Sequence, residues 1–413
     1  MSENLKYGSI SSAEAMELEN KYGAHNYHPL PIVIAKGEGA KVWDPEGNEY
    51  FDFLSAYSAV NQGHCHPKII NALIEQAKTL TLTSRAFYSN NLGEYEKFIT
   101  EFFGFDMVLP MNSGAEAVET AIKLSRKWGY EKKGIENGKA VIVFAEGNFH
   151  GRTITIISAS GDPDCREGFG PFTPGIHKIP YNNAQALEEY LSAEGKHVAA
   201  FIVEPIQGEA GVFVPDDGYL KSCYDICKKH NVLFVADEVQ TGVARTGRLL
   251  ACDYENVRPD ILILGKAISG GVYPVSAVLA DKEIMLVIKP GQHGSTYGGN
   301  PLACAVAKAA LEIVKDENLI EKAFDLGKIF REELEQFNHP MIKLVRGRGL
   351  LNAIVVEPKD GKEAWDVCVL LKEAGLLCKP THRHIIRFAP PLVISEEELR
   401  QALEIIKGVF NAL

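Results

Sequence analysis

The segments Leu233-Phe-Val-Ala-Asp-Glu-Val-Gln240 and Ile261-Leu-Ile-Leu-Gly-Lys266 decide the fold that the sequence predicts. Each is an unbroken apolar run of strand length; two carboxylates end the first and a lysine ends the second. Such runs, flanked by helical patterns, are typical of a parallel sheet that is covered on both faces. We therefore expect an α/β fold with Asp237 and Lys266 at the carboxyl edge of the sheet, where ligands of open α/β sheets bind.

A carboxylate and a lysine at neighbouring strand ends suit the chemistry of pyridoxal phosphate. This cofactor needs a lysine for its Schiff base and an anionic partner that keeps its ring nitrogen protonated. On this interpretation Lys266 forms the Schiff base and Asp237 is the pyridinium partner. The alternative is a surface lysine and a helix-capping aspartate, which is the commoner case for an isolated pair.

Composition narrows the class of protein. A chain of 413 residues can form one large domain and a smaller one. The net charge of -11 argues against a general nucleic-acid binder, and no apolar run reaches membrane-spanning length. Residues 1–20 lack an apolar signal core and arginine, so a cytoplasmic location is expected.

The cysteines and histidines give no metal site. The eight cysteines form no CxxC pair, so we expect reduced thiols, with Cys165 the most exposed of them. His64-Cys65-His66 lacks a second ligand pair at a useful spacing, and no metal is expected there.

Two segments offer groups for a phosphate. Ser113, Gly114 and Ala115 open a predicted helix that runs to Tyr130, and amides at a helix start can hold an anion. The glycine-rich stretch 291–300 carries the hydroxyls of Ser295 and Thr296. An ordinary helix cap and a flexible connection are the alternatives.

Two further strand ends carry polar residues. Phe149-His-Gly-Arg152 follows the predicted strand 140–145, and such a ring and arginine can stack on a flat ligand and clamp a carboxylate. The alternative is a core phenylalanine and a solvated arginine. The predicted strand 199–203 ends in Glu204-Pro-Ile-Gln-Gly-Glu209, so polar strand ends recur in one sheet.

In order and spacing, these segments resemble the class III pyridoxal-phosphate aminotransferases of fold type I. The resemblance runs from Lys21-Tyr-Gly-Ala-His-Asn-Tyr27 to Ile385-Ile-Arg-Phe-Ala-Pro-Pro-Leu392, and the blocks 51–67 and 203–211 are its most specific parts. It implies a large domain, residues 61–314, with a mostly parallel central sheet covered by helices. It also implies a smaller α+β domain, residues 315–413, and an N-terminal segment, residues 1–60, that packs with the small domain and the dimer partner.

The resemblance implies a role for each cofactor-binding residue. Lys266 carries the Schiff base, Asp237 pairs with the ring nitrogen, Gln240 bonds the ring hydroxyl and Phe149 stacks on the ring. The phosphate is held by the segment of Ser113, Gly114 and Ala115 and by the segment of Ser295 and Thr296. Thr296 reaches it from the other subunit, which implies an obligate homodimer with shared active sites.

The same resemblance implies L-ornithine and 2-oxoglutarate as substrates of a ping-pong transamination. Arg152, Tyr27 and Tyr57 would bind the ornithine carboxylate. Glu209 would pair with Arg387 in the first half-reaction and release it to 2-oxoglutarate in the second. Transaminases of N-acetylornithine, gamma-aminobutyrate or another omega-amino acid are the alternatives within the family, and they would not be expected to combine Tyr27, Tyr57 and Glu209.

Three other classes fail on specific residues. A P-loop would need glycine at Asp260 and serine or threonine at Ala267, and no GxGxxG of a dinucleotide-binding domain follows a strand. A protein that keeps this fold for binding alone would be expected to have lost Lys266 or Asp237, and both are present.

Overall fold

The computed structural model describes residues 5–413. The strands are β1 (Lys36–Glu38), β2 (Lys41–Trp43), β3 (Glu49–Asp52), β4 (Met107–Met111), β5 (Val141–Ala145), β6 (Ile176–Ile179), β7 (Val198–Val203), β8 (Leu233–Asp237), β9 (Ile261–Leu264), β10 (Ser276–Ala280), β11 (Ile342–Arg348), β12 (Leu351–Val356), β13 (Leu376–Leu377), β14 (Lys379–Thr381) and β15 (Ile385–Phe388). The helical segments are α1 (Ser12–Tyr22), α2 (Ser55–Ser58), α3 (Pro67–Thr79), α4 (Leu92–Phe103), α5 (Gly114–Trp128), α6 (Ile154–Ala159), α7 (Pro163–Arg166), α8 (Ala184–Glu194), α9 (Tyr219–Lys229), α10 (Lys282–Met285), α11 (Pro301–Asp316), α12 (Leu319–Phe337), α13 (Ala364–Glu373) and α14 (Glu396–Asn411).

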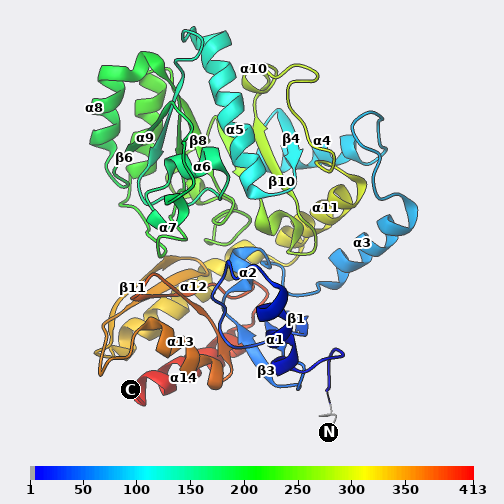
Figure 1. Cartoon of the computed structure of the whole chain (residues 1–413), viewed down its shortest axis with the longest axis vertical. Coiled ribbons are helices and arrows are strands. Elements are labelled where there is room, and N and C mark those ends of the chain that lie inside the picture. Colours follow the sequence, from blue (N-terminus) through cyan, green and yellow to red (C-terminus); the bar gives the residue numbers. More distant parts are fainter. Residues whose placement is uncertain (1–4) are drawn as a thin grey trace.

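A seven-stranded sheet in the order β4-β10-β9-β8-β7-β5-β6 is the centre of the larger part of the molecule (Figure 1). Its strands β6, β5, β7, β8 and β9 run parallel, while β10 runs antiparallel to both β9 and β4. The predicted α/β fold with a mostly parallel sheet is confirmed. The direction of β10 was not predictable, because its apolar residues have the same pattern as those of its parallel neighbours.

Side chains along β8 alternate between the two faces of the sheet, and both faces are covered, which explains why every residue from Leu233 to Ala236 is apolar. Leu233 and Val235 pack in one core cluster with the buried face of α5, whereas Phe234 and Ala236 pack on the other face of the sheet against α8 and α9. Successive strand residues point to opposite faces, so helices on both sides require apolar residues at every position. These helices position the strand whose last residue is Asp237.

The N-terminal segment packs with the C-terminal part of the chain. In the lower half of Figure 1, the blue β3 lies beside the orange and red segments that include α13 and α14. Strand β13 pairs in parallel with β3, with Leu376 opposite Phe51. The third sheet, of order β11-β12-β15-β14, belongs to the same half of the molecule.

Arg245 connects the two halves of the molecule. Its guanidinium group is fully buried and donates hydrogen bonds to the carbonyl oxygens of Leu350 and Pro390, at 2.9 and 2.6 Å, and to the side chain of Asn61. Hydrogen bonds to buried carbonyls satisfy a charge that would otherwise be costly to bury.

The division of the chain into domains at residues 60 and 314 remains a prediction.

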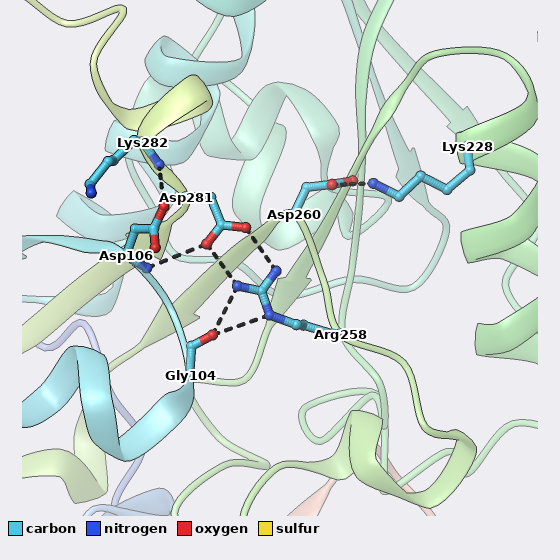
Figure 2. A network of polar contacts seen from close by, with 7 residues as sticks. All are labelled: Gly104, Asp106, Lys228, Arg258, Asp260, Asp281 and Lys282. Carbon is cyan, nitrogen blue, oxygen red and sulfur yellow. Dashed lines mark hydrogen bonds and ion pairs between the residues drawn. The ribbon is translucent and has the colours of Figure 1, made fainter.

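Figure 2 shows a polar network at the amino ends of β8 and β9, the edge of the central sheet that lies away from Asp237 and Lys266. Arg258 donates to Asp281 and to the carbonyl of Gly104, which ends α4, and Lys228 pairs with Asp260, which immediately precedes β9. The amide of Phe234 donates to the same Asp260 carboxylate at 2.8 Å. The ion pairs Arg258–Asp281 and Lys228–Asp260 therefore stabilise this edge of the sheet and leave no reason to assign it a ligand-binding role.

The cysteine prediction was wrong in one respect. Cys165 is only 7% exposed although it lies in the short helix α7 among polar residues, and Cys65 is the exposed thiol. Among residues 5–413, no group of three or more His, Cys, Asp or Glu side chains is arranged to hold a metal ion. His64 contacts Asp52, and His66 contacts Glu317.

Among residues 5–413, none of the helices combines the length and apolar character needed to cross a bilayer.

Candidate active site

A cavity opens at the carboxyl edge of the central sheet. Asp237 is the last residue of β8, and Lys266 follows the end of β9 by two residues. Both line the cavity, together with Gly114, Ala115, Phe149, His150, Gly151, Glu204, Ile206, Glu209, Val239, Gln240 and Thr241. The sequence therefore correctly placed a carboxylate and an amine at one edge of the sheet.

The start of α5 forms one wall of the cavity. Ser113 caps this helix: its hydroxyl accepts a bond from the amide of Glu116, and its own amide donates to the Glu116 carboxylate at 2.8 Å. The amides of Gly114 and Ala115 have no acceptor within the helix, as at any helix start. They are the groups at this wall that can donate to an anion. Because Gly151 packs directly on Ala115, the loop of Phe149 lies close to them.

Asp237 is held by His150. Nδ1 of His150 lies 2.6 Å from Oδ2 of Asp237, and both side chains are at most 5% exposed. Burial would lower the pKa of His150, but the hydrogen bond with Asp237 and its charge outweigh burial and raise that pKa. Oδ1 of Asp237 accepts from the amide of Val239. The carboxylate is therefore fixed in orientation at the cavity wall.

Glu204 lines the cavity close to this pair. Its carboxyl group is buried and accepts a hydrogen bond from the amide of Phe149 at 2.9 Å. Burial raises the pKa of Glu204 to about 8. Burial therefore favours an uncharged Glu204 beside the His150–Asp237 pair near neutral pH.

Lys266 presents an amine with no fixed partner. Its Nζ makes no hydrogen bond or ion pair within residues 5–413, whereas Nζ of Lys228 is paired with Asp260 (Figure 2). Burial lowers the pKa of Lys266; the charge of Arg387 acts in the same direction, and Glu209 and Asp237 oppose it. Its φ of 45° lies in the left-handed region, which costs a residue other than glycine roughly 1–3 kcal/mol and is concentrated at functional sites.

Glu209 and Arg387 form an ion pair beside the amine. Nη1 of Arg387 donates to Oε1 of Glu209 at 2.8 Å, and the arginine side chain is only 2% exposed. Nε2 of Gln240 donates to the same oxygen at 2.9 Å. Burial would raise the pKa of Glu209, but the charge and hydrogen bond of Arg387 outweigh burial and lower it. A Cβ at Gly208 would overlap Gln240, so only glycine permits this arrangement.

Tyr57 lies in a left-handed turn. Four consecutive residues, 55–58, have positive φ angles of 48–69°. Each residue other than glycine pays roughly 1–2 kcal/mol in this conformation. The carboxylate of Asp52 compensates by accepting the amides of Leu54 and Ser55, both at 2.9 Å. The turn brings the Tyr57 ring to 5.1 Å from the Arg387 guanidinium carbon.

Several predicted residues are not among those that line the cavity: Ser113, Tyr57 and Arg387, described above, and also Tyr27, Arg152, Ser295 and Thr296. Tyr27 is 64% exposed, and Arg152 is exposed with its guanidinium carbon 5.8 Å from the ring of Phe149. Ser295 accepts a hydrogen bond from Asn112, and Thr296 lies in a separate hollow lined also by Phe87. Within one chain, Thr296 therefore does not face Lys266.

Sequence reasoning missed the contacts between distant segments. His150 was assigned no role, although it directly contacts Asp237. Glu204 and Lys379 were also not singled out. Their environments depend on residues far away in the chain, and no local spacing signals such contacts.

Comparisons with known proteins agree with this geometry. A family model described as aminotransferase class-III matches residues 22–410. The chain is 59% identical to ornithine aminotransferase car2 of Schizosaccharomyces pombe, over all of this chain and 96% of that protein.

Two solved structures are similar over nearly the whole chain. The ornithine aminotransferase of Toxoplasma gondii, described with partial occupancy of PLP at its active site, has a TM-score of 0.95 at 51% identity, covering 99% of this chain and 95% of that one. The acetylornithine aminotransferase of Elizabethkingia anophelis has a TM-score of 0.90 at 59% identity, covering 98% of this chain and 100% of that one.

Proposed function

The chain belongs to the class III aminotransferases, and we propose that it transfers the delta-amino group of L-ornithine to 2-oxoglutarate, giving glutamate 5-semialdehyde and glutamate. The observation that carries this proposal is the Glu209–Arg387 ion pair beside the free amine of Lys266. A separable ion pair lets one pocket accept a diamino acid and then a dicarboxylate.

The cofactor of this family is pyridoxal phosphate, and the residues of the cavity fit it. The free amides of Gly114 and Ala115 suit its phosphate, the ring of Phe149 suits a flat ring, and the fixed carboxylate of Asp237 suits a protonated ring nitrogen. Lys266 is the amine for the covalent bond. When bound, the cofactor supplies an electron-withdrawing ring that stabilises negative charge on the substrate carbon.

Lys266 is the group that moves the proton. Because burial lowers its pKa, a larger share of Nζ is neutral near pH 7 than for an exposed lysine, and a neutral amine accepts a proton. Once the substrate amine has replaced Nζ in the covalent bond to the cofactor, the released Nζ would accept the proton from the substrate carbon that bears the reacting amino group and return it to the cofactor. General acid and base catalysis of this kind contributes about 10² to 10⁴ in rate.

Asp237 and His150 keep the electrostatics of the ring fixed. A charged carboxylate at this wall would favour a proton on the ring nitrogen of the bound cofactor. His150 restrains that carboxylate and offsets part of its burial cost through a hydrogen bond.

Glu209 and Arg387 select between the two substrates. While they are paired, the guanidinium charge is largely neutralised, so the pocket has no strong site for a second carboxylate. The carboxylate of ornithine is assigned to Tyr57, Tyr27 and Arg152. When 2-oxoglutarate enters, its second carboxylate competes with Glu209 for Arg387.

We assign the phosphate-binding hydroxyl of Thr296 to a second copy of the chain. Thr296 lies away from Lys266 in its own chain, in a hollow that also includes Phe87 and Arg85. Phe87 and Tyr88 are 72% and 101% exposed, and neighbouring apolar side chains of this size favour a protein interface. These features support a homodimer with shared sites.

A second candidate function is transamination of N-acetylornithine, favoured by the similarity to the Elizabethkingia anophelis enzyme. Steady-state kcat/KM with L-ornithine, N-acetylornithine and gamma-aminobutyrate, each with 2-oxoglutarate, distinguishes the candidates. The proposal expects the highest value for L-ornithine. A higher value for N-acetylornithine would replace it with the second candidate.

A further inference from the structure

Lys379 lies beside Tyr57 and Tyr27. It is in β14, directly opposite Arg387 in β15. Side chains at opposed positions of an antiparallel pair lie on the same face of the sheet. Nζ of Lys379 donates to the hydroxyl oxygen of Tyr57 at 3.1 Å, and the Arg387 guanidinium carbon lies 5.1 Å from the centre of the same ring. Tyr57 is therefore in contact with two cations.

The charge of Lys379 is not neutralised by a carboxylate. Among residues 5–413, its ammonium group makes a hydrogen bond to the hydroxyl group of Tyr57 and cation–π contacts with the rings of Tyr57 and Tyr27, whose centres lie 5.8 and 5.9 Å from Nζ. Arg387, by contrast, is paired with Glu209. When that pair is closed, Lys379 remains a free positive charge next to Tyr57.

The hydrogen bond also fixes the direction of the Tyr57 hydroxyl. A lysine ammonium group can only donate, so the phenol oxygen must accept from it. The phenol hydrogen is then free for another acceptor, because Tyr57 donates to no group within the described residues 5–413. An incoming carboxylate is a suitable acceptor, because charged acceptors form the stronger hydrogen bonds.

We propose that Lys379 is a positioning residue for the carboxylate of the amino-acid substrate. It holds Tyr57 as a hydrogen-bond donor toward that carboxylate and adds positive charge at the site while Glu209 masks Arg387. This inference rests on the proposed function, since it concerns the half-reaction in which an amino acid with a terminal amine is bound.

The test compares L-ornithine with 1,4-diaminobutane, which has the same terminal amine and no carboxylate. We expect Lys379→Met in the holoenzyme to lower kcat/KM for L-ornithine about tenfold, mainly through a higher KM, because a hydrogen bond to a charged group is removed. The value for 1,4-diaminobutane should stay within about twofold of wild type, and Lys379→Arg should restore most of the loss. Lys343→Met, in β11 of the same sheet and paired with Glu357, is the matched control and should change neither substrate.

An equal loss on both substrates would overturn the inference, because it would indicate a general structural role. An unchanged kcat/KM for L-ornithine would also overturn it. A double-mutant cycle with Tyr57→Phe tests the route: Lys379→Met should cost little more in that background, and fully additive losses would refute action through Tyr57. Failure of the proposed function is distinct, because it would appear in the wild-type enzyme as poor turnover of L-ornithine.

Discussion

Removal of Glu209 should relax the discrimination between ornithine and glutamate. In the variant Glu209→Ala, the Arg387 guanidinium group loses its 2.8 Å carboxylate partner, and the acceptor left to it among residues 5–413 is Oε1 of Gln240 at 3.4 Å. Arg387 then remains buried and unmasked, ready to bind the side-chain carboxylate of glutamate.

The size of the effect follows from that contact. A hydrogen bond to a charged group contributes about 1.5–3 kcal/mol. In wild type, glutamate must displace Glu209 from this bond, and in the variant it need not. We expect the rate with L-glutamate relative to that with L-ornithine to rise roughly 10- to 150-fold, which is the same free energy expressed as a ratio.

The assay is rapid mixing of the holoenzyme with each amino acid in the absence of an oxoacid, following the cofactor absorbance over a single turnover. Glu209→Gln separates charge from volume and should give a smaller change in the same direction. Asp217→Asn removes an acid whose ion pair with Arg348, at 2.7 Å, lies away from the cavity, and should leave the ratio unchanged. An unchanged ratio in Glu209→Ala, or an equal change in Asp217→Asn, would refute the masking of Arg387.

Four further results are expected. Lys266→Ala should abolish multiple turnover while the circular-dichroism spectrum stays native, because Lys266 is the cavity amine; normal turnover would remove it from the mechanism. Co-expression of Lys266→Ala with Thr296→Ala should give more activity than Thr296→Ala alone, since mixed dimers regain one complete site; mere dilution would contradict a shared site. Burial raises the pKa of Glu204 to about 8, so the folded state holds a proton that the unfolded state loses near pH 4.5, and the free energy of unfolding should fall as pH rises between these values. Glu204→Gln should make the melting temperature less dependent on pH over this range. An unaltered pH dependence would exclude Glu204 as its source. Asp52→Ala should lower the free energy of unfolding by about 2–3 kcal/mol, because the left-handed turn loses its hydrogen bonds to a charged group. Denaturant titrations measure this change, and a stability equal to wild type would show that the turn needs no support from Asp52.

The sequence was sufficient for features that depend on local pattern. Short apolar runs flanked by helices predicted parallel strands, and the carboxyl ends of such strands meet at one edge. Asp237 and Lys266 therefore could be placed together before any coordinates were known, and the cavity contains both. The close approach of α5 and the loop of Phe149, by contrast, became visible only in the structure, where a Cβ at Gly151 would lie 2.9 Å from the Cβ of Ala115.

Features that depend on long-range packing were not predictable. His150 meets Asp237 across 87 residues of chain, and Lys379 meets Tyr57 across 322. The left-handed turn at 55–58 carries no glycine to indicate it, and its conformation is supported by Asp52. Cys165 was expected to be exposed from its polar neighbours, but tertiary packing covers its side chain.

The most direct test of the account is a single-turnover absorbance measurement on the purified holoenzyme without 2-oxoglutarate. Mixing with L-ornithine should bleach the band of the bound cofactor faster than mixing with N-acetylornithine or gamma-aminobutyrate, and should release one pyrroline product per bleached site. Faster bleaching by N-acetylornithine would contradict the roles of Tyr27, Tyr57 and Glu209. A protein with no such band after addition of pyridoxal phosphate would contradict the assignment of Lys266 itself.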